Sequence, residues 1–160
     1  MKPNKLKVYT PLISLVMIAV LSSAAVAHGI QGNLFEWMHY FMGFFFCQFA
    51  MLKIFHLGGF VEGFQKYDLI AMRYRSYGYL YPFIELALGL GYLSFVFSVI
   101  TYLVTIVFML IGGIGVIKAL KKGLDLRCAC MGTVLDVPLS TVTLTEDIGM
   151  GVMAFIMLVL

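Results

Sequence analysis

Charged residues are scarce in this sequence: they make up 12% of its 160 residues, while 62% are hydrophobic. An ordinary soluble domain is about 25% charged and about half apolar. The composition therefore excludes a soluble domain and predicts an integral membrane protein. The chain also lacks a phosphate-binding loop and any serine, histidine and carboxylate arrangement typical of a hydrolase. We expect neither ATP use nor hydrolysis, and the length suits one domain.

Apolar segments long enough to form membrane helices occupy most of the chain. A spanning helix needs about 20 residues, and segments of this kind lie at 8–27 and 35–57. The stretch 79–119 is about twice as long, so we expect two helices that turn near 98–101, where small polar residues interrupt it. A last helix begins within 139–144. The pattern predicts an all-α membrane bundle of four core helices preceded by an N-terminal helix.

The N-terminal segment has two interpretations. A basic start, an apolar run and a small-x-small ending at 25–27 describe a cleavable signal peptide. The run is also nearly long enough to span the bilayer as a permanent helix, which we favour. The predicted organisation is an N-terminal transmembrane helix or signal peptide at 1–27 and a four-helix membrane domain at 35–160.

The basic residues all fall on alternate connections of this predicted bundle. They precede the first helix, lie at or after the end of the second, and follow the fourth. By the positive-inside rule, the N-terminus and the loop after the fourth helix are cytoplasmic, in a bacterial inner (plasma) membrane. The formal net charge of +3 serves this orientation, so we expect contact with the lipid bilayer and no nucleic acid partner.

The sequence Cys128-Ala129-Cys130 is the most informative local motif, because it follows a run of basic residues that favours thiolate over thiol. A structural disulfide is disfavoured in the cytoplasm. The pair is interpreted as redox-cycling thiols or as a soft-metal site, in which the thioether of Met131 is a third ligand for Cu(I). A third interpretation is two ordinary reduced cysteines. No other cofactor is expected.

Three ionisable side chains lie within or at the ends of predicted helices: Lys53, Glu85 and Glu146. Each costs on the order of 3 kcal/mol in mid-bilayer and usually finds a partner. Lys53 and Glu85 have matched depth and opposite charge, so we predict an ion pair between them. The alternatives are that Lys53 snorkels to the interface and that Glu146 only closes a capping box with Thr143.

Several short elements together resemble the methylamine-utilisation membrane protein E (MauE) family, a relative of the DoxX-like four-helix membrane proteins. They are Lys53-Ile54-Phe55, Gly59-Phe60, Phe64-Gln65-Lys66-Tyr67-Asp68, Tyr81-Pro82-Phe83-Ile84-Glu85-Leu86 with Gly89, and Cys128-Ala129-Cys130-Met131-Gly132. The resemblance implies a redox-associated four-helix membrane protein that supports maturation of a disulfide-rich partner in methylamine metabolism.

Three functions follow as hypotheses. The first is thiol–disulfide exchange or electron transfer through Cys128 and Cys130, with Lys53, Glu85 and Glu146 as supporting charges and a cytoplasmic thioredoxin-like or glutaredoxin-like partner. The second is binding or transport of a soft metal such as copper or mercury, with a metallochaperone as partner. The third is a membrane assembly factor without chemistry of its own.

Overall fold

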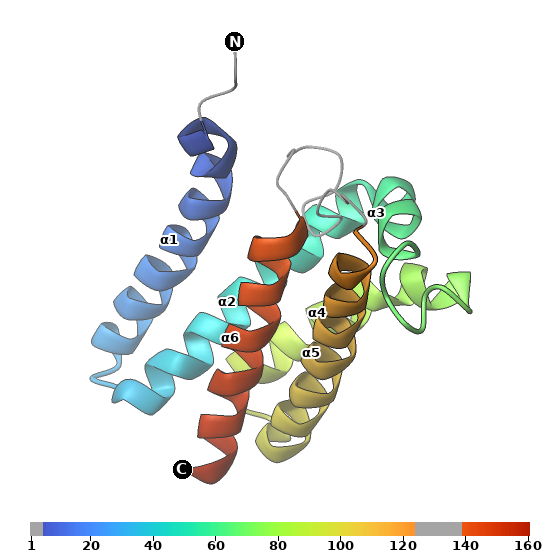
Figure 1. The fold of residues 1–160 in the computed structure, drawn as a ribbon. Helices are drawn as coiled ribbons and strands as arrows, with labels where there is room; N and C mark the ends of the chain where they lie inside the picture. Colours follow the sequence, from blue (N-terminus) through green and yellow to red (C-terminus); the bar gives the residue numbers. More distant parts are fainter. Residues whose placement is uncertain (1–4, 124–138) are drawn as a thin grey trace.

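The structure, a computed structural model, describes residues 5–123 and 139–160, and this part of the chain is built from α-helices alone (Figure 1). The helices are α1 (Lys5–Gly29), α2 (Leu34–Phe55), α3 (Leu57–Phe64), α4 (Arg75–Ser94), α5 (Ser98–Lys121) and α6 (Leu139–Val159). Three of them, α1, α2 and α5, are long and apolar enough to cross a membrane. The predicted all-α membrane bundle is confirmed.

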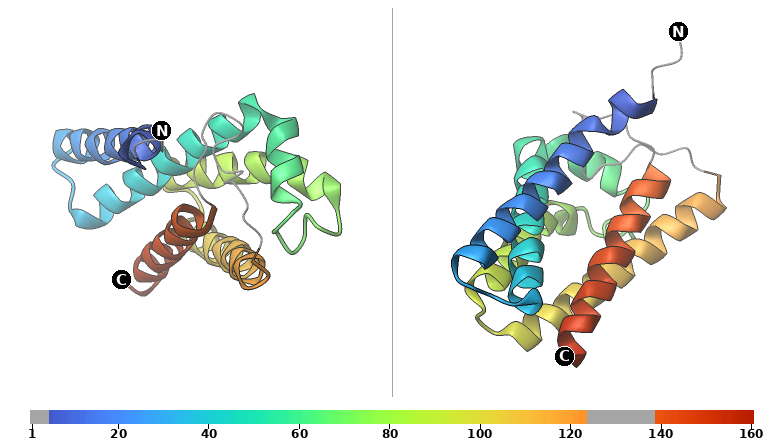
Figure 2. Two further views of the ribbon diagram at one scale, coloured as in Figure 1. Left: turned by 45° about the horizontal axis from the view of Figure 1, so that its top comes forward. Right: turned by 90° about the vertical axis from the view of Figure 1, so that its left-hand side faces the viewer.

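The helices pack mainly as antiparallel neighbours. Helix α2 packs against α1 on one side and α4 on the other, and α5 packs along α6 (Figures 1 and 2). Many large apolar side chains remain on the outer surface, including Leu103, Leu110 and Phe155. Exposed apolar side chains of this kind suit contact with lipid tails. The elements α2, α4, α5 and α6 are the four predicted core helices, and the short helix α3 was not predicted.

The turn between α4 and α5 comes slightly earlier than expected. It is made by residues 95–97, where Phe95 and Phe97 adopt the left-handed conformation with φ of 56° and 52°. Ser98 and Thr101 do not form the turn. Their hydroxyls instead donate hydrogen bonds to the carbonyl oxygens of Phe95 and Phe97, so they stabilise the start of α5.

One helix start also differs from the sequence expectation. Helix α4 begins at Arg75, so Glu85 lies about 15 Å along its axis at about 1.5 Å per residue. Helix α6 begins at Leu139, within the expected range 139–144. This early start places Thr143 inside the helix, so the alternative in which Glu146 closes a capping box with Thr143 is wrong. A capping box does start α2, where Asn33 Oδ1 accepts from the Glu36 N–H at 3.1 Å and Glu36 Oε2 accepts from the Asn33 N–H at 2.8 Å.

Small residues bring α2 and α4 into close contact. A Cβ atom added at Gly89 would lie 2.8 Å from Cys47 Sγ and 3.1 Å from the carbonyl oxygen of Gly43. Glycine thus permits an approach that a larger residue would block, as is common between membrane helices. Cys47 is half-buried at this contact and acts as a small packing residue.

Candidate functional site

The predicted ion pair between Lys53 of α2 and Glu85 of α4 is present. Lys53 Nζ donates to both carboxylate oxygens of Glu85, at 2.6 Å and 2.5 Å, and both residues are buried, at 4% and 5% exposure. Lys53 therefore does not snorkel to the interface. Because both charges are shielded from solvent, each helps to compensate the other.

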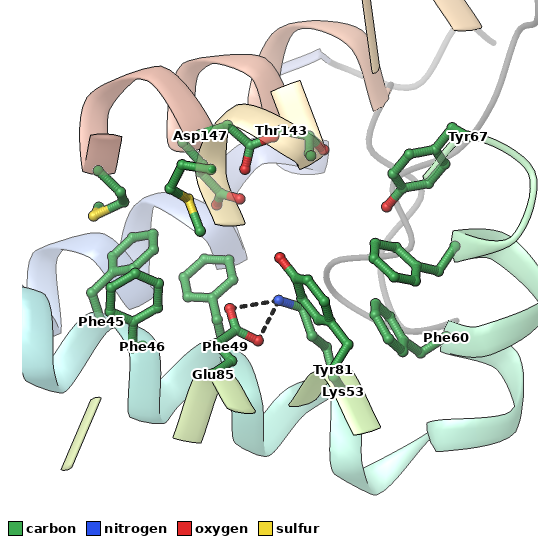
Figure 3. A pocket seen from close by; sticks show the side chains of 15 residues that line it. Phe45, Phe46, Phe49, Lys53, Phe60, Tyr67, Tyr81, Glu85, Thr143 and Asp147 are labelled. Carbon is green, nitrogen blue, oxygen red and sulfur yellow. Dashed lines mark hydrogen bonds and ion pairs between the residues drawn. The ribbon is translucent and has the colours of Figure 1, made fainter. Parts of the chain in front are cut away.

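Helix α6 brings two further carboxylates to this place. Glu146 and Asp147 line the same small cavity as Lys53 and Glu85, and Figure 3 shows Asp147 reaching in from α6 beside the ion pair. Asp147 Oδ2 is buried and has no hydrogen-bond partner among the described residues. We call these four residues the charged cluster.

A glycine makes room for this carboxylate. A Cβ added at Gly112 of α5 would lie 3.1 Å from Asp147 Oδ2, so the carboxylate rests against the backbone of α5. The absence of a side chain at Gly112 therefore admits a charged side chain between α5 and α6. The charged cluster is shared by α2, α4 and α6, with α5 closing one side.

Aromatic rings form most of the remaining wall (Figure 3). Lys53 Nζ lies 5.2 Å from the centre of the Tyr81 ring and 5.7 Å from that of Phe60, within cation–π range. Phe45 and Phe49 stack at 4.3 Å beside the cavity. Rings of this kind exclude bulk water and strengthen the electrostatic interactions among the enclosed charges.

The volume of the cavity that water can occupy is about 30 Å³. This is room for about one or two water molecules and not for an organic substrate. One lysine faces three carboxylates in this space. The arrangement is able to hold charge, bind water and pass protons between neighbouring groups, but it leaves no room for substrate chemistry within the cavity itself.

The structure thus brings together Lys53, Glu85 and Glu146, the three supporting charges named from the sequence. The other predicted site residues, Cys128, Cys130 and Met131, lie outside the described residues. Within residues 5–123 and 139–160, no group of three or more His, Cys, Asp or Glu side chains is placed to hold a metal ion.

Sequence reasoning named the neighbouring Asp68 only within the family resemblance and gave it no role in the site. Asp68 is fully buried in the connection between α3 and α4. Its Oδ1 accepts hydrogen bonds from the backbone N–H groups of Ile70 and Ala71, at 2.9 Å and 2.8 Å. Burial raises the pKa of Asp68, and these two hydrogen bonds oppose that shift in part. Asp68 fixes the shape of this connection at the end of the bundle that holds the charged cluster.

A second polar group lies toward the opposite end of α2 and was also missed. His39 is buried; one ring nitrogen is 3.1 Å from the carbonyl oxygen of Tyr92 and the other contacts the hydroxyl of Tyr102. The Tyr92 hydroxyl in turn donates to Thr105 Oγ1 at 3.1 Å. A histidine inside an apolar segment was the available signal, but nothing in the sequence indicates its partners.

Comparison with known proteins agrees with this architecture. The family described as methylamine utilisation protein MauE matches residues 31–160, a range that begins before α2 and includes the whole charged cluster. No curated protein and no solved structure matches the chain. Since the family match covers most of the sequence and the helices form a membrane bundle, the chain belongs to the MauE family of methylamine-utilisation membrane proteins.

Proposed function

We propose that this protein carries out thiol–disulfide exchange at the membrane and thereby supports maturation of a partner protein in methylamine utilisation. The exchanging groups are Cys128 and Cys130. One observation carries the proposal: the residues that join α5 to α6 include both cysteines, and the first turns of α6 lead directly into the charged cluster through Thr143 and Asp147. The cysteines are therefore tethered close in sequence to the buried charges.

The reaction is a transfer of two electrons between dithiol and disulfide. The thiolate of one cysteine attacks a disulfide of the partner and forms a mixed disulfide, while the released partner sulfur takes up a proton. The second cysteine then attacks the mixed disulfide, which yields a Cys128–Cys130 bridge and a reduced partner; the reverse sequence oxidises the partner. With one intervening residue the bridge is strained, so it favours cycling over storage.

Basic side chains before the motif support the required thiolate. Lys118 and Lys121 lie in the last turn of α5, and Lys122 and Arg127 follow. Cations near a thiol lower the free energy of its ionised form. In this proposal the charged cluster holds α2, α4 and α6 in register and accepts or releases protons at the end of the bundle where the cysteines are attached.

The proposal is tested by alkylation mass spectrometry of the purified protein across a series of redox buffers. We expect a reversible bridge between Cys128 and Cys130. When either cysteine is replaced by serine, the remaining cysteine should form a stable mixed disulfide with a thioredoxin-like protein. Cys47→Ser is the matched control and should leave the bridge unchanged, because Cys47 lies at the α2–α4 contact.

Two other outcomes would overturn the proposal. Protection of both thiols by added Cu(I), without any reversible bridge, indicates soft-metal handling through Cys128, Cys130 and Met131. If neither redox buffer nor Cu(I) changes the alkylation pattern, and the Cys128→Ser/Cys130→Ser variant still supports partner maturation in cells, the protein is an assembly factor whose cysteines are dispensable.

A further inference from the structure

A hollow lined by basic residues lies at the end of α5, separate from the charged cluster. Its volume is about 560 Å³, and four of the side chains that line it are cationic. These are Lys66, Arg73, Lys118 and Lys122. We call it the basic hollow.

Two segments far apart in the sequence form this hollow through one close contact. Lys118 and Lys122 lie four residues apart, so they share one side at the end of α5, and Lys66 and Arg73 lie in the connection between α3 and α4. The connection rests on α5 at Gly115, where an added Cβ would lie 2.6 Å from the carbonyl oxygen of Tyr67. Glycine at this position brings the two pairs of cations around one space.

The four cations have no anionic partner in the described part of the chain. None of them forms an ion pair there, and none of the described residues that line the hollow is Asp or Glu. Orientation in the membrane requires basic residues at this end but does not require four of them to converge on one concave space. Their mutual repulsion is relieved when an anion occupies it.

The position of the hollow indicates which anion. Helix α5 is apolar enough to cross a membrane and ends at Lys121, so the hollow lies at the edge of the membrane-spanning region. Its wall also contains the apolar side chains of Leu69 and Met72. A ligand with a phosphate and an apolar portion fits both features. We propose that the basic hollow binds the head group of an anionic phospholipid.

The test measures lipid binding to the full-length protein in neutral detergent by native mass spectrometry, with phosphatidylglycerol compared with phosphatidylcholine. We expect phosphatidylglycerol to bind about tenfold more tightly or better. The affinity of the Arg73→Gln/Lys118→Gln variant for phosphatidylglycerol should be lower by about tenfold or more, since each basic residue near an anionic head group adds to the free energy of lipid binding. Lys66→Gln/Lys122→Gln should give a similar loss.

The matched control is Arg75→Gln/Lys121→Gln, which removes two exposed cations from the same end of the bundle but not from the hollow. Its affinity should stay within about twofold of the original. An equal loss in the control would mean diffuse attraction and overturn the proposal, as would the absence of any preference for phosphatidylglycerol. Displacement of the lipid by millimolar inorganic phosphate would instead assign the hollow to free phosphate. Circular dichroism of each variant checks that it is folded.

Discussion

At the scale of single residues, the buried charges are tolerable only as a set. An ionised side chain at mid-bilayer costs on the order of 3 kcal/mol, and Lys53 and Glu85 offset this cost through two short hydrogen bonds. Tyr81 and Phe60 add cation–π contacts to the same ammonium group. Removing Glu85 therefore takes away the carboxylate to which Lys53 donates both hydrogen bonds, and removing Lys53 leaves three carboxylates in one cavity without this cation.

We expect Lys53→Met and Glu85→Gln, made singly, each to lower the free energy of unfolding by about 3–5 kcal/mol, the usual effect of breaking a buried pair. The double variant Lys53→Met/Glu85→Leu should recover part of that loss, because it removes both members of the ion pair together, although the carboxylates of Glu146 and Asp147 remain. The measurement is a double-mutant cycle by unfolding in mixed detergent micelles. Lys121→Met, at an exposed position, is the control and should change stability little.

If the double variant loses as much free energy of unfolding as the two single variants added together, Lys53 and Glu85 do not stabilise each other as an ion pair. Single variants within about 1 kcal/mol of the original protein would likewise mean that water in the cavity solvates each charge adequately without its partner. Either result would leave the charged cluster without the positioning role that the proposed function gives it.

The sequence was sufficient to predict the ion pair and to name Glu146 as a supporting charge, but not to add Asp147 to the cluster. Lys53 and Glu85 could be paired because each stood out in an apolar segment at a similar depth and with opposite charge. Asp147 was not identified from the sequence, since its burial depends on Gly112 opening space in a different helix. His39 and Asp68 were missed for the same reason: their partners are set by tertiary contacts and not by spacing along the chain.

At the scale of elements, apolar segments predicted the helices well and their ends less well. The turn at 95–97 contains two aromatic residues in the left-handed conformation, which no local preference indicates. The polar residues expected to form the turn, Ser98 and Thr101, instead donate hydrogen bonds to backbone carbonyl oxygens at the start of α5. Hydrophobicity determines which segments enter the bilayer, while side-chain hydrogen bonds determine where a helix begins.

Contact between α2 and α4 depends on Gly89. We expect Gly89→Ala to lower the free energy of unfolding by about 1–3 kcal/mol, a typical cost of overpacking, because its Cβ would press against Cys47 and the backbone of α2. Gly149→Ala is the control, since nothing lies within 4 Å of a Cβ there. That variant should be neutral or slightly stabilising. Equal effects of the two substitutions on detergent unfolding would show that the α2–α4 contact is not close in solution.

At the scale of the whole molecule, α1 stands somewhat apart from the other helices. Its principal contact within the described residues is with α2 (Figure 1). The family match begins after α1, at residue 31. One face of α1 nevertheless makes this contact. Ala19, Ser23 and Ala27 recur every fourth residue and are all buried, at 0%, 0% and 6% exposure. Small residues at this spacing let two membrane helices approach closely.

This packing favours retention of α1 over its removal as a signal peptide. We expect intact-mass spectrometry of the protein purified from membranes to give the full-length chain. Ala19→Leu and Ser23→Leu should each lower the free energy of unfolding by about 1–3 kcal/mol through overpacking, whereas Ala24→Leu, on the exposed face of the same helix, should not. A mature chain that begins at His28 would refute retention directly. The leucine variants separate the remaining cases: if α1 stays attached but all three substitutions are neutral, it is an anchor that lies beside the bundle without stabilising it, and the small-residue face has no structural role.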